Sequence, residues 1–396
     1  MDVFILGGAR TPMADYTGRL KDLSALELGA IASRAALART GVDPAAVDHV
    51  VFGNVLQTSA DAVYGARHIA LKAGLPIEVP ALTVNRLCGS GIQAAISGGQ
   101  MIRLGEAGIV LTGGTESMSQ APHVIRGLRS GLRLGQGELE DTLWSALLDT
   151  HCGCTMAATA ENCASTYGVS REEQDRYALR SQQLAEAAWK AGRFDDEVVP
   201  VEVRSRTGVE TFSRDDHMRP DSTLEGLAKL PPAFGKGGCV TAGNASGIVD
   251  GAAALILASP EAVRAHGLTP LAKLTHWATV GVDPAHMGIG PVPATRRVLE
   301  AAGLTLADID LFEVNEAFAA QYLSVEKELG LDRDRVNVNG GAIALGHPLG
   351  MTGTRLLLTL TLELRRRGLT RGVATACIGG GQGIAAIIER VGLEKQ

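Results

Sequence analysis

Residues 85–91 read Asn-Arg-Leu-Cys-Gly-Ser-Gly and precede the alanine-rich run IQAAISGGQMIRLG at residues 92–105. The run predicts a helix, so Cys88 faces unpaired backbone N–H groups and the positive end of the helix dipole, which both favour a thiolate. This help matters to a nucleophile, because an unperturbed thiol with a pKa near 8.5 is only about 3% ionised at pH 7. The neighbouring glycines let a substrate carbonyl approach the backbone. The alternative is a buried structural cysteine in a turn of small residues.

A second glycine-rich stretch, residues 339–350, reads Asn-Gly-Gly-Ala-Ile-Ala-Leu-Gly-His-Pro-Leu-Gly. Its histidine, His347, lies between a glycine and a proline on a predicted loop before a helix rich in Ala and Leu. A backbone with so little freedom suits a general base or an oxyanion donor, because both need fixed geometry. A purely structural histidine is the alternative.

A third stretch, Cys-Ile-Gly-Gly-Gly-Gln-Gly at residues 377–383, follows the apolar strand GVATA. Its glycines offer N–H groups to an anion and place Cys377 at the mouth of the predicted sheet. Gly381-x-Gly383-x-x-Ala386 also resembles a dinucleotide fingerprint. That motif requires a complete βαβ unit and an acidic residue about twenty positions later, and the sequence stops at residue 396.

A fourth stretch, Val-Asn-Glu-Ala-Phe-Ala at residues 314–319, follows a strand predicted at residues 309–313. Asn315 lies where this strand becomes a helix, so its amide can orient a water or donate to an oxyanion. Alternatively, Asn315 or Glu316 simply caps the helix.

The composition is that of a globular protein, with 396 residues, 45% hydrophobic and 20% charged. This length predicts two or three core-forming units. The net charge of −6 gives no reason to expect binding to nucleic acid or to a membrane surface. No apolar stretch is long enough to span a membrane, and the start MDVFILGGARTP predicts a strand and a turn, not a signal peptide. Six cysteines in so long a chain indicate free thiols in a reducing compartment.

Two segments, residues 37–48 and 299–310, show the same order of helix end, glycine cap, acidic turn and strand start. A Val-Asn pair and then a strand ending in glycines follow each of them, which predicts an internal duplication; the alternative is chance likeness between two α/β units. Residues 121–247 are richer in charge and turns and contain a helical pattern at 171–192. We interpret them as an insertion that can serve as a lid or a cofactor-binding surface.

Taken together, the two cysteine stretches, the Gly-His-Pro loop and Asn315 resemble the thiolase family over essentially the whole chain. Further matching motifs are GGARTP from Gly7, GGTESMSQAP from Gly113, TAGNASG at 241–247 and DGAAA from Asp250. Residues 85–91, the SMSQAP stretch and ELEDTLW at 138–144 resemble the branch that contains the mitochondrial 3-ketoacyl-CoA thiolases.

The resemblance implies an α/β, duplicated thiolase fold: two similar βαβαβαββ-type halves packed in five layers, with an inserted loop domain. We expect the N-terminal half at 1–120 and the inserted loop domain, for CoA binding and oligomerisation, at 121–247. The remainder of the N-terminal half is expected at 248–270 and the C-terminal half at 271–396. A homodimer or homotetramer is implied, in the cytoplasm for a bacterial protein or the mitochondrial matrix for a eukaryotic one.

The resemblance also implies roles for individual residues. Cys88 corresponds to the acylated nucleophile, and His347 to the base that activates this thiol and polarises a thioester oxygen. Cys377 corresponds to the thiol that shuttles the second proton. Asn315 would hold a water in one oxyanion hole, and the backbone N–H groups of Cys88 and Gly379 would form the other.

CoA is expected as a substrate, with no metal and no further cofactor. The resemblance makes Ser246 a candidate CoA contact and Arg219 a candidate near the phosphates. Met156 is a candidate substrate contact. Short-chain thiolases often have a histidine directly before this methionine, whereas this chain has Thr155, which favours longer 3-ketoacyl chains.

The implied reaction is CoA-dependent cleavage of 3-ketoacyl-CoA to acetyl-CoA and a shortened acyl-CoA, together with the reverse Claisen condensation. One alternative is a short-chain acetoacetyl-CoA thiolase working in the biosynthetic direction. A ketosynthase-like condensing enzyme is another, although Cys377 argues against it. Two alternatives of another kind remain. One is zinc binding by His151, Cys152, Cys154 and Cys163, and the other is an inactive scaffold.

Overall fold

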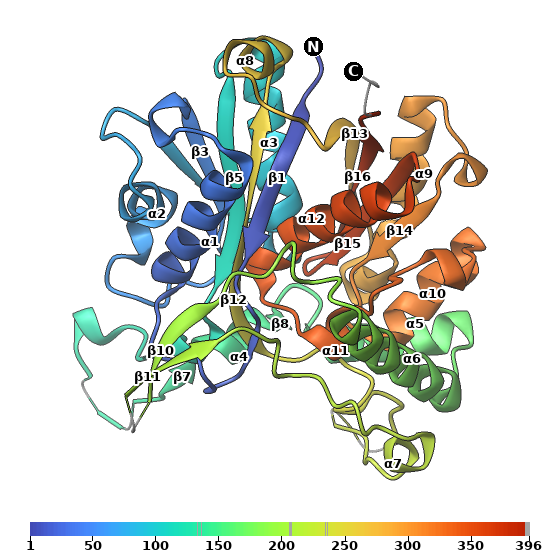
Figure 1. Cartoon of the computed structure of the whole chain (residues 1–396). Helices are drawn as coiled ribbons and strands as arrows, with labels where there is room; N and C mark the ends of the chain where they lie inside the picture. Colours follow the sequence, from blue (N-terminus) through green and yellow to red (C-terminus); the bar gives the residue numbers. More distant parts are fainter. Residues whose placement is uncertain (133, 136, 206–207, 234, 236, 393–396) are drawn as a thin grey trace.

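The computed structural model describes residues 1–132, 134–135, 137–205, 208–233, 235 and 237–392, so the last four residues of the expected C-terminal half lie outside it. Its centre is a continuous sheet in the order β14-β15-β16-β13-β1-β12-β5-β3-β4, with β2 paired to β12 (Figure 1). The N-terminal half contributes β1 (Phe4–Arg10), β2 (Ala14–Asp15), β3 (His49–Gly53), β4 (Ala81–Val84), β5 (Ile109–Glu116) and β12 (Val249–Ala258). The C-terminal half contributes β13 (Ala272–Gly281), β14 (Leu311–Val314), β15 (Arg371–Ile378) and β16 (Gln382–Arg390).

The two halves repeat one strand order. In the N-terminal half β3 is parallel to β5, β5 is antiparallel to β12, and β12 is antiparallel to β1. In the C-terminal half β14 is likewise parallel to β15, β15 is antiparallel to β16, and β16 is antiparallel to β13. The duplication predicted from the sequence is therefore confirmed. Gly53 pairs with Gly114 in one half and Val314 with Thr375 in the other. Asn54 follows Gly53 as Asn315 follows Val314, so these two asparagines are counterparts. Glu116 lies two residues after Gly114, and Cys377 lies two residues after Thr375, so these two residues are counterparts as well.

Helices cover both faces of each half-sheet and produce the five expected layers (Figure 1). One apolar cluster joins α1 (Ala25–Thr40) and α2 (Gly65–Ala73) to the outer face of the N-terminal half. A second joins α9 (Pro291–Ala302) and α10 (Ala319–Leu329) to the outer face of the C-terminal half. The third surrounds α3 (Ser90–Leu104) and α12 (Leu349–Arg367), which lie between the two half-sheets.

The two central helices touch at glycines near their N-terminal ends. A Cβ added to Gly91 would lie 2.3 Å from the backbone nitrogen of Thr354, and one added to Gly353 would lie 2.4 Å from that of Ile92. Only glycine permits so close an approach of two backbones. The contact therefore draws together the two segments that precede α3 and α12.

The segment between β5 and β12 forms small hairpins and helices around this core. Its strands are β6 (His123–Val124), β7 (Glu140–Asp141), β8 (Leu148–Asp149), β9 (Cys154–Thr155), β10 (Val201–Ser205) and β11 (Gly208–Phe212). Its helices are α4 (Thr142–Ala146), α5 (Met156–Tyr167), α6 (Arg171–Lys190) and α7 (Leu224–Ala228). Short α8 (Pro260–Ala265) and α11 (Ala342–Leu345) complete the chain. Helix α6 begins at a capping box formed by Ser170 and Glu173, close to the start predicted from the sequence.

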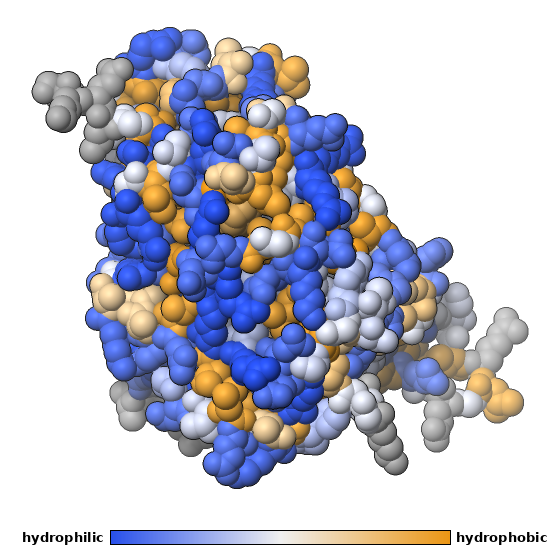
Figure 2. All heavy atoms as spheres, turned by 90° about the vertical axis from the view of Figure 1, so that its right-hand side faces the viewer, coloured by the Kyte–Doolittle hydropathy of each residue, from blue (hydrophilic) through white to orange (hydrophobic). Residues whose placement is uncertain are grey.

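The surface differs between the two halves. Exposed large hydrophobic side chains occur in the N-terminal half and the following segment, among them Tyr64, Ile77 and Leu82, but none lies in the described residues 249–392. Figure 2 shows the side on the right of Figure 1, where hydrophilic residues break up the hydrophobic ones. Of the helices within the described ranges, none has both the length and the apolar character needed to cross a membrane.

Candidate active site

Four residues from four different segments meet at the N-terminal ends of the central helices. Cys88 lies in a single 3₁₀ turn, Leu87–Gly89, directly before α3, and His347 lies between α11 and α12. Asn315 directly follows β14, and Cys377 is the penultimate residue of the neighbouring parallel strand β15. The Nδ2 of Asn315 is 3.3 Å from the Nε2 of His347. Sequence reasoning singled out all four, and the fold brings them together.

The protonation of His347 follows from its hydrogen bonds. Its Nδ1 is 2.6 Å from the Oγ1 of Thr352, and that hydroxyl donates its only proton to the carbonyl of Pro348 at 2.9 Å. The Thr352 oxygen must therefore accept from His347, which places the imidazole proton on Nδ1. The lone pair of Nε2 then faces Asn315 and accepts from its side-chain Nδ2 at 3.3 Å.

The charge state of His347 agrees with this assignment. Burial, followed by the nearby positive charge of Arg355, lowers the pKa of His347 to about 3. The imidazole is consequently neutral at physiological pH and able to accept a proton.

Both thiols are held in the neutral form. Burial raises the pKa of Cys88 to about 11, although the backbone N–H groups of Gly379 and of Cys88 itself lower it. Burial and the neighbouring thiols Cys88 and Cys163 raise the pKa of Cys377 well above its usual value. Cys88 keeps the help expected from its place at the helix start, since backbone N–H groups lower its pKa, but burial outweighs this help and leaves the thiol neutral in the free protein. Cys88 requires a base, and Cys377 is suited to be an acid.

A cavity of about 640 Å³ leads to His347. Its walls are largely apolar and include Trp144, Met156 and Phe318, which suits an acyl chain and the pantetheine arm of CoA. Ser246 also lines it. The cavity is therefore open to both parts of an acyl-CoA substrate.

Arg219 does not line this cavity. Its guanidinium donates to Asp15 at 2.8 Å and to the carbonyl of His217 at 2.5 Å, and its side chain is 57% exposed. The predicted contact between Arg219 and CoA phosphates thus stays a prediction. The substrate contacts of Met156 and Ser246 also stay predictions, although both residues line the cavity.

Comparison with known proteins places this site in a family. The family model described as "Thiolase, N-terminal domain" matches residues 3–261, and the one described as "Thiolase, C-terminal domain" matches residues 268–390. The chain belongs to the thiolase family. It is therefore an acyltransferase that uses CoA as a substrate without a further cofactor. This membership decides against the ketosynthase alternative.

Individual thiolases resemble the chain over nearly its whole length. It is 56% identical to the mitochondrial 3-ketoacyl-CoA thiolase of Homo sapiens over 388 residues, 98% of each chain. It is 51% identical to the acetyl-CoA acetyltransferase of Pseudomonas aeruginosa over 395 residues, 98% of this chain and 99% of that one. The crystal structure of the human mitochondrial enzyme superposes with a TM-score of 0.97 at 55% identity, covering 98% of this chain and 99% of that one.

Sequence reasoning missed two residues that shape the thiolase site. Thr352 fixes the tautomer of His347, and Glu116 places a buried charge close enough to raise the pKa of Cys88. Thr352 could have been suspected, since it lies one turn into the helix that follows the Gly-His-Pro loop. Nothing in the sequence connects Glu116 with Gly350, whose N–H it accepts although the two residues are 234 positions apart.

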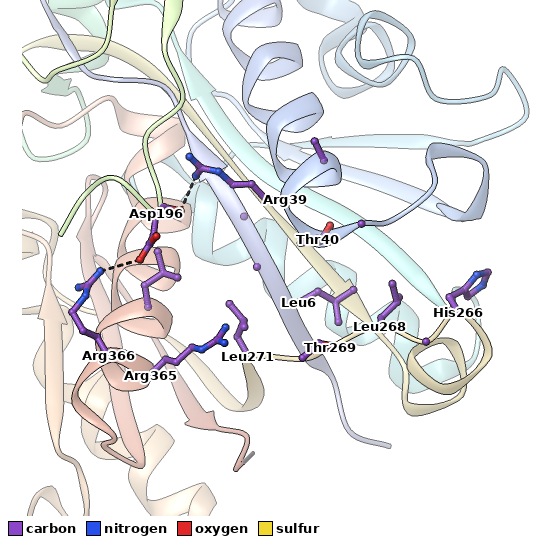
Figure 3. Close-up of a pocket in the computed structure, with 16 residues that line it drawn as sticks. Leu6, Arg39, Thr40, Asp196, His266, Leu268, Thr269, Leu271, Arg365 and Arg366 are labelled. Carbon is purple, nitrogen blue, oxygen red and sulfur yellow. Dashed lines mark hydrogen bonds and ion pairs between the residues drawn. The ribbon is translucent and has the colours of Figure 1, made fainter. Parts of the chain in front are cut away.

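A larger cavity, of about 970 Å³, lies at the opposite end of α12 (Figure 3). Arg39 donates there to the carbonyls of Asp196 and Val198 at 2.7 Å, and Arg366 pairs with the carboxylate of Asp196 at 3.6 Å. These arginines neutralise helix C-termini, where cations are stabilising. None of the catalytic or substrate-binding residues predicted from the sequence lines this cavity.

The two other motifs do not form sites. Residues 379–381 make the turn between the antiparallel strands β15 and β16, so no helix follows the glycines as a dinucleotide fingerprint requires. Cys152 and Cys154 lie at the β8–β9 hairpin, whereas Cys163 is buried inside α5. Within the described part of the chain, no group of three or more His, Cys, Asp or Glu residues is arranged to hold a metal.

Proposed function

We propose that this thiolase is a degradative enzyme of broad chain length, which cleaves 3-ketoacyl-CoA through an acyl-Cys88 intermediate. The observation that carries the proposal is the neutral imidazole of His347, which holds its proton on Nδ1, presents Nε2 to Asn315 and lines an apolar cavity. The 56% identity to a mitochondrial 3-ketoacyl-CoA thiolase supports the same reading.

In the first half-reaction, the Nε2 of His347 takes the proton of Cys88, and the sulfur attacks the 3-keto carbon. The bond between C2 and C3 breaks, and the acetyl-CoA enolate takes the proton of Cys377. In the second, CoA thiol returns a proton to Cys377 and attacks the acyl carbon. Cys88 leaves as a thiolate and recovers its proton from His347.

Charge that develops on the two carbonyl oxygens needs donors in place beforehand. The N–H of Gly379 already points at the sulfur of Cys88, so together with the N–H of Cys88 it can donate to the oxygen of the acyl group. The Oδ1 of Asn315 is buried without a hydrogen-bond partner among the described residues, which supports a role in holding a water. That water and His347 would stabilise the enolate.

Coenzyme A is proposed to lie against the inserted segment, residues 121–247, because Ser246 and Met156 of this segment line the cavity. Arg219 would have to leave Asp15 to reach a phosphate. The proposed domain division is the N-terminal half at 1–120, the inserted loop domain at 121–247, the remainder of the N-terminal half at 248–270 and the C-terminal half at 271–396.

The protein is proposed to form a homodimer or homotetramer. Strand β4 is the last strand of the sheet in the N-terminal half, and its Leu82 is 42% exposed. An uncovered edge strand with apolar neighbours such as Tyr64 and Ile77 is suited to pair with a second copy. The proposed location is the cytoplasm for a bacterial protein or the mitochondrial matrix for a eukaryotic one, which is consistent with a mitochondrial and a bacterial relative. Light scattering after size exclusion gives the number of subunits.

A short-chain, biosynthetic acetoacetyl-CoA thiolase is the second candidate, favoured by the 51% identity to an acetyl-CoA acetyltransferase. The test compares CoA-dependent cleavage of acetoacetyl-CoA and 3-ketooctanoyl-CoA, with Cys88→Ala as the control. Cleavage of both, abolished in the variant, supports the degradative enzyme. Cleavage of acetoacetyl-CoA alone supports the second candidate, and cleavage of neither by folded, reduced protein refutes both.

A further inference from the structure

Two fully buried carboxylates hold the backbone on either side of His347. Glu316 accepts the N–H of Ile343, in α11, at 3.1 Å. Glu116 accepts the N–H of Gly350, in the first turn of α12, at 2.8 Å. Both carboxylates have 0% exposure. The loop that carries His347 therefore begins and ends at a buried negative group.

Glu116 ties this loop to the N-terminal half. Besides Gly350, it accepts the side-chain amide of Asn54 at 3.0 Å and the backbone N–H groups of Val55 and Leu56 at 3.2 and 3.0 Å. Burial raises the pKa of Glu116 to about 7, while the backbone donors lower it. Because all four partners are donors, the contacts fit the ionised form, which predominates at pH 8.

Glu316 ties the loop to the C-terminal half and to α6. It accepts the hydroxyls of Tyr177 and Ser181, both at 2.7 Å, and the amide of Asn337 at 2.9 Å. A Cβ added to Gly341 would lie 2.2 Å from the carboxyl carbon of Glu316, so the backbone of the loop rests directly on this group. Here too every partner is a donor.

Neither Glu116 nor Glu316 forms an ion pair with a Lys or Arg within the described ranges. Burying an uncompensated charge is unfavourable, and an apolar residue would serve the core better. Only a carboxylate, however, can accept four hydrogen bonds at one point. A glutamine offers one acceptor oxygen and turns an NH₂ group towards donors.

We propose that Glu116 and Glu316 are positioning residues that fix the place of the His347 imidazole beside Asn315. This inference rests on the proposed role of His347 as the base. A displacement of about 1 Å at a reacting group lowers rates by as much as about 100-fold, so the two carboxylates act on catalysis without touching the substrate.

The experiment uses the full chain at pH 8 and the variants Glu116→Gln and Glu316→Gln. Glu197→Gln is the matched control, since Glu197 is equally buried but contacts Arg10 and the hydroxyl of Thr359, away from the loop. We expect kcat for thiolysis to fall at least about tenfold in both variants, with KM for CoA changed less than about twofold. In Glu197→Gln, kcat should stay within about twofold of the original value.

A double-mutant cycle with His347→Ala separates positioning from general destabilisation. The rate at which iodoacetamide alkylates Cys88 is the readout, because it remains measurable when turnover is lost. Each Gln substitution should slow alkylation more in the original protein than in the His347→Ala background. In that background Glu316→Gln should have almost no effect, and Glu116→Gln should accelerate alkylation, because it removes a negative charge that raises the pKa of Cys88.

Equal slowing in both backgrounds, unchanged kcat in folded Gln variants, or failure of both to fold where Glu197→Gln folds would each overturn the inference. If one variant fails to fold, the cycle is completed with the other. An active His347→Ala protein would instead refute the proposed function. Loss of activity in His347→Ala with full activity in the Gln variants would refute only the positioning role.

Discussion

Replacing Thr352 by valine tests how the base of the site is prepared. Valine has nearly the shape of threonine, so the change removes the hydroxyl and leaves the packing of α12 in place. The hydroxyl is the acceptor of the Nδ1 proton of His347, at 2.6 Å, in a region with almost no exposure to water. Without it, this proton has no partner in the tautomer that catalysis needs.

The magnitude follows from the cost of a buried donor left unpaired, about 1–3 kcal/mol. That penalty falls on the Nδ1–H tautomer alone, so the imidazole shifts its proton to Nε2 and ceases to be a base. At 1.4 kcal/mol for each tenfold change, we expect kcat/KM for thiolysis to fall by about 5- to 150-fold.

Thr354→Val is the matched control. Thr354 lies two residues further along the same helix, is equally buried, and has no hydrogen-bond partner for its hydroxyl among the described residues. Its kcat/KM should remain within about twofold of the original value, and Thr352→Ser should recover most of the activity. Steady-state thiolysis of acetoacetyl-CoA, followed as loss of substrate absorbance, measures all three. A Thr352→Val enzyme as active as Thr354→Val would refute the tautomer argument.

Three further predictions concern the thiol, the helix contact and the cavity. Since the pKa of Cys88 is raised to about 11, its alkylation by iodoacetamide should accelerate about tenfold per pH unit from pH 7 to 10; a plateau near pH 8.5 would contradict this. Gly353→Ala forces a Cβ to within 2.4 Å of the backbone of Ile92, so the free energy of unfolding in urea should fall by about 1–3 kcal/mol. An unchanged urea midpoint would show that α3 and α12 move apart without loss of stability. Thr155→His should lower the ratio of 3-ketooctanoyl-CoA cleavage to acetoacetyl-CoA cleavage, because the larger side chain narrows the cavity that Thr155 lines. A constant ratio would show that position 155 does not select the length of the acyl chain.

The sequence was enough to predict the duplication and the four central residues, because each of these lies at a helix start or a strand end. Around Cys88, His347 and Cys377 these positions are marked locally by glycine or proline, whereas Asn315 was singled out by its place at a strand end. The pKa of Cys88 was not predictable in the same way. The helix terminus is visible in the sequence, but the burial that outweighs it depends on how distant parts of the chain pack around Cys88.

The supporting residues could not be predicted for a related reason. Glu116 and Thr352 act through single hydrogen bonds whose partners are chosen by the packing of the two halves. The same packing directs Arg219 to Asp15 and brings Ser246 to the cavity. Motifs identify the groups that react, whereas the three-dimensional arrangement decides which groups support them.

The repeated strand order has a consequence for the history of the chain. Two identical ancestral halves would have presented two equivalent sites across their shared axis, each with its own asparagine and its own strand-end residue. In the present protein one of these positions carries Asn315 and Cys377, while the equivalent one carries Asn54 and Glu116, joined to each other at 3.0 Å. The N-terminal position therefore supports the loop that carries His347, whereas the C-terminal position carries reacting groups, so neither half alone contains all four residues of the site.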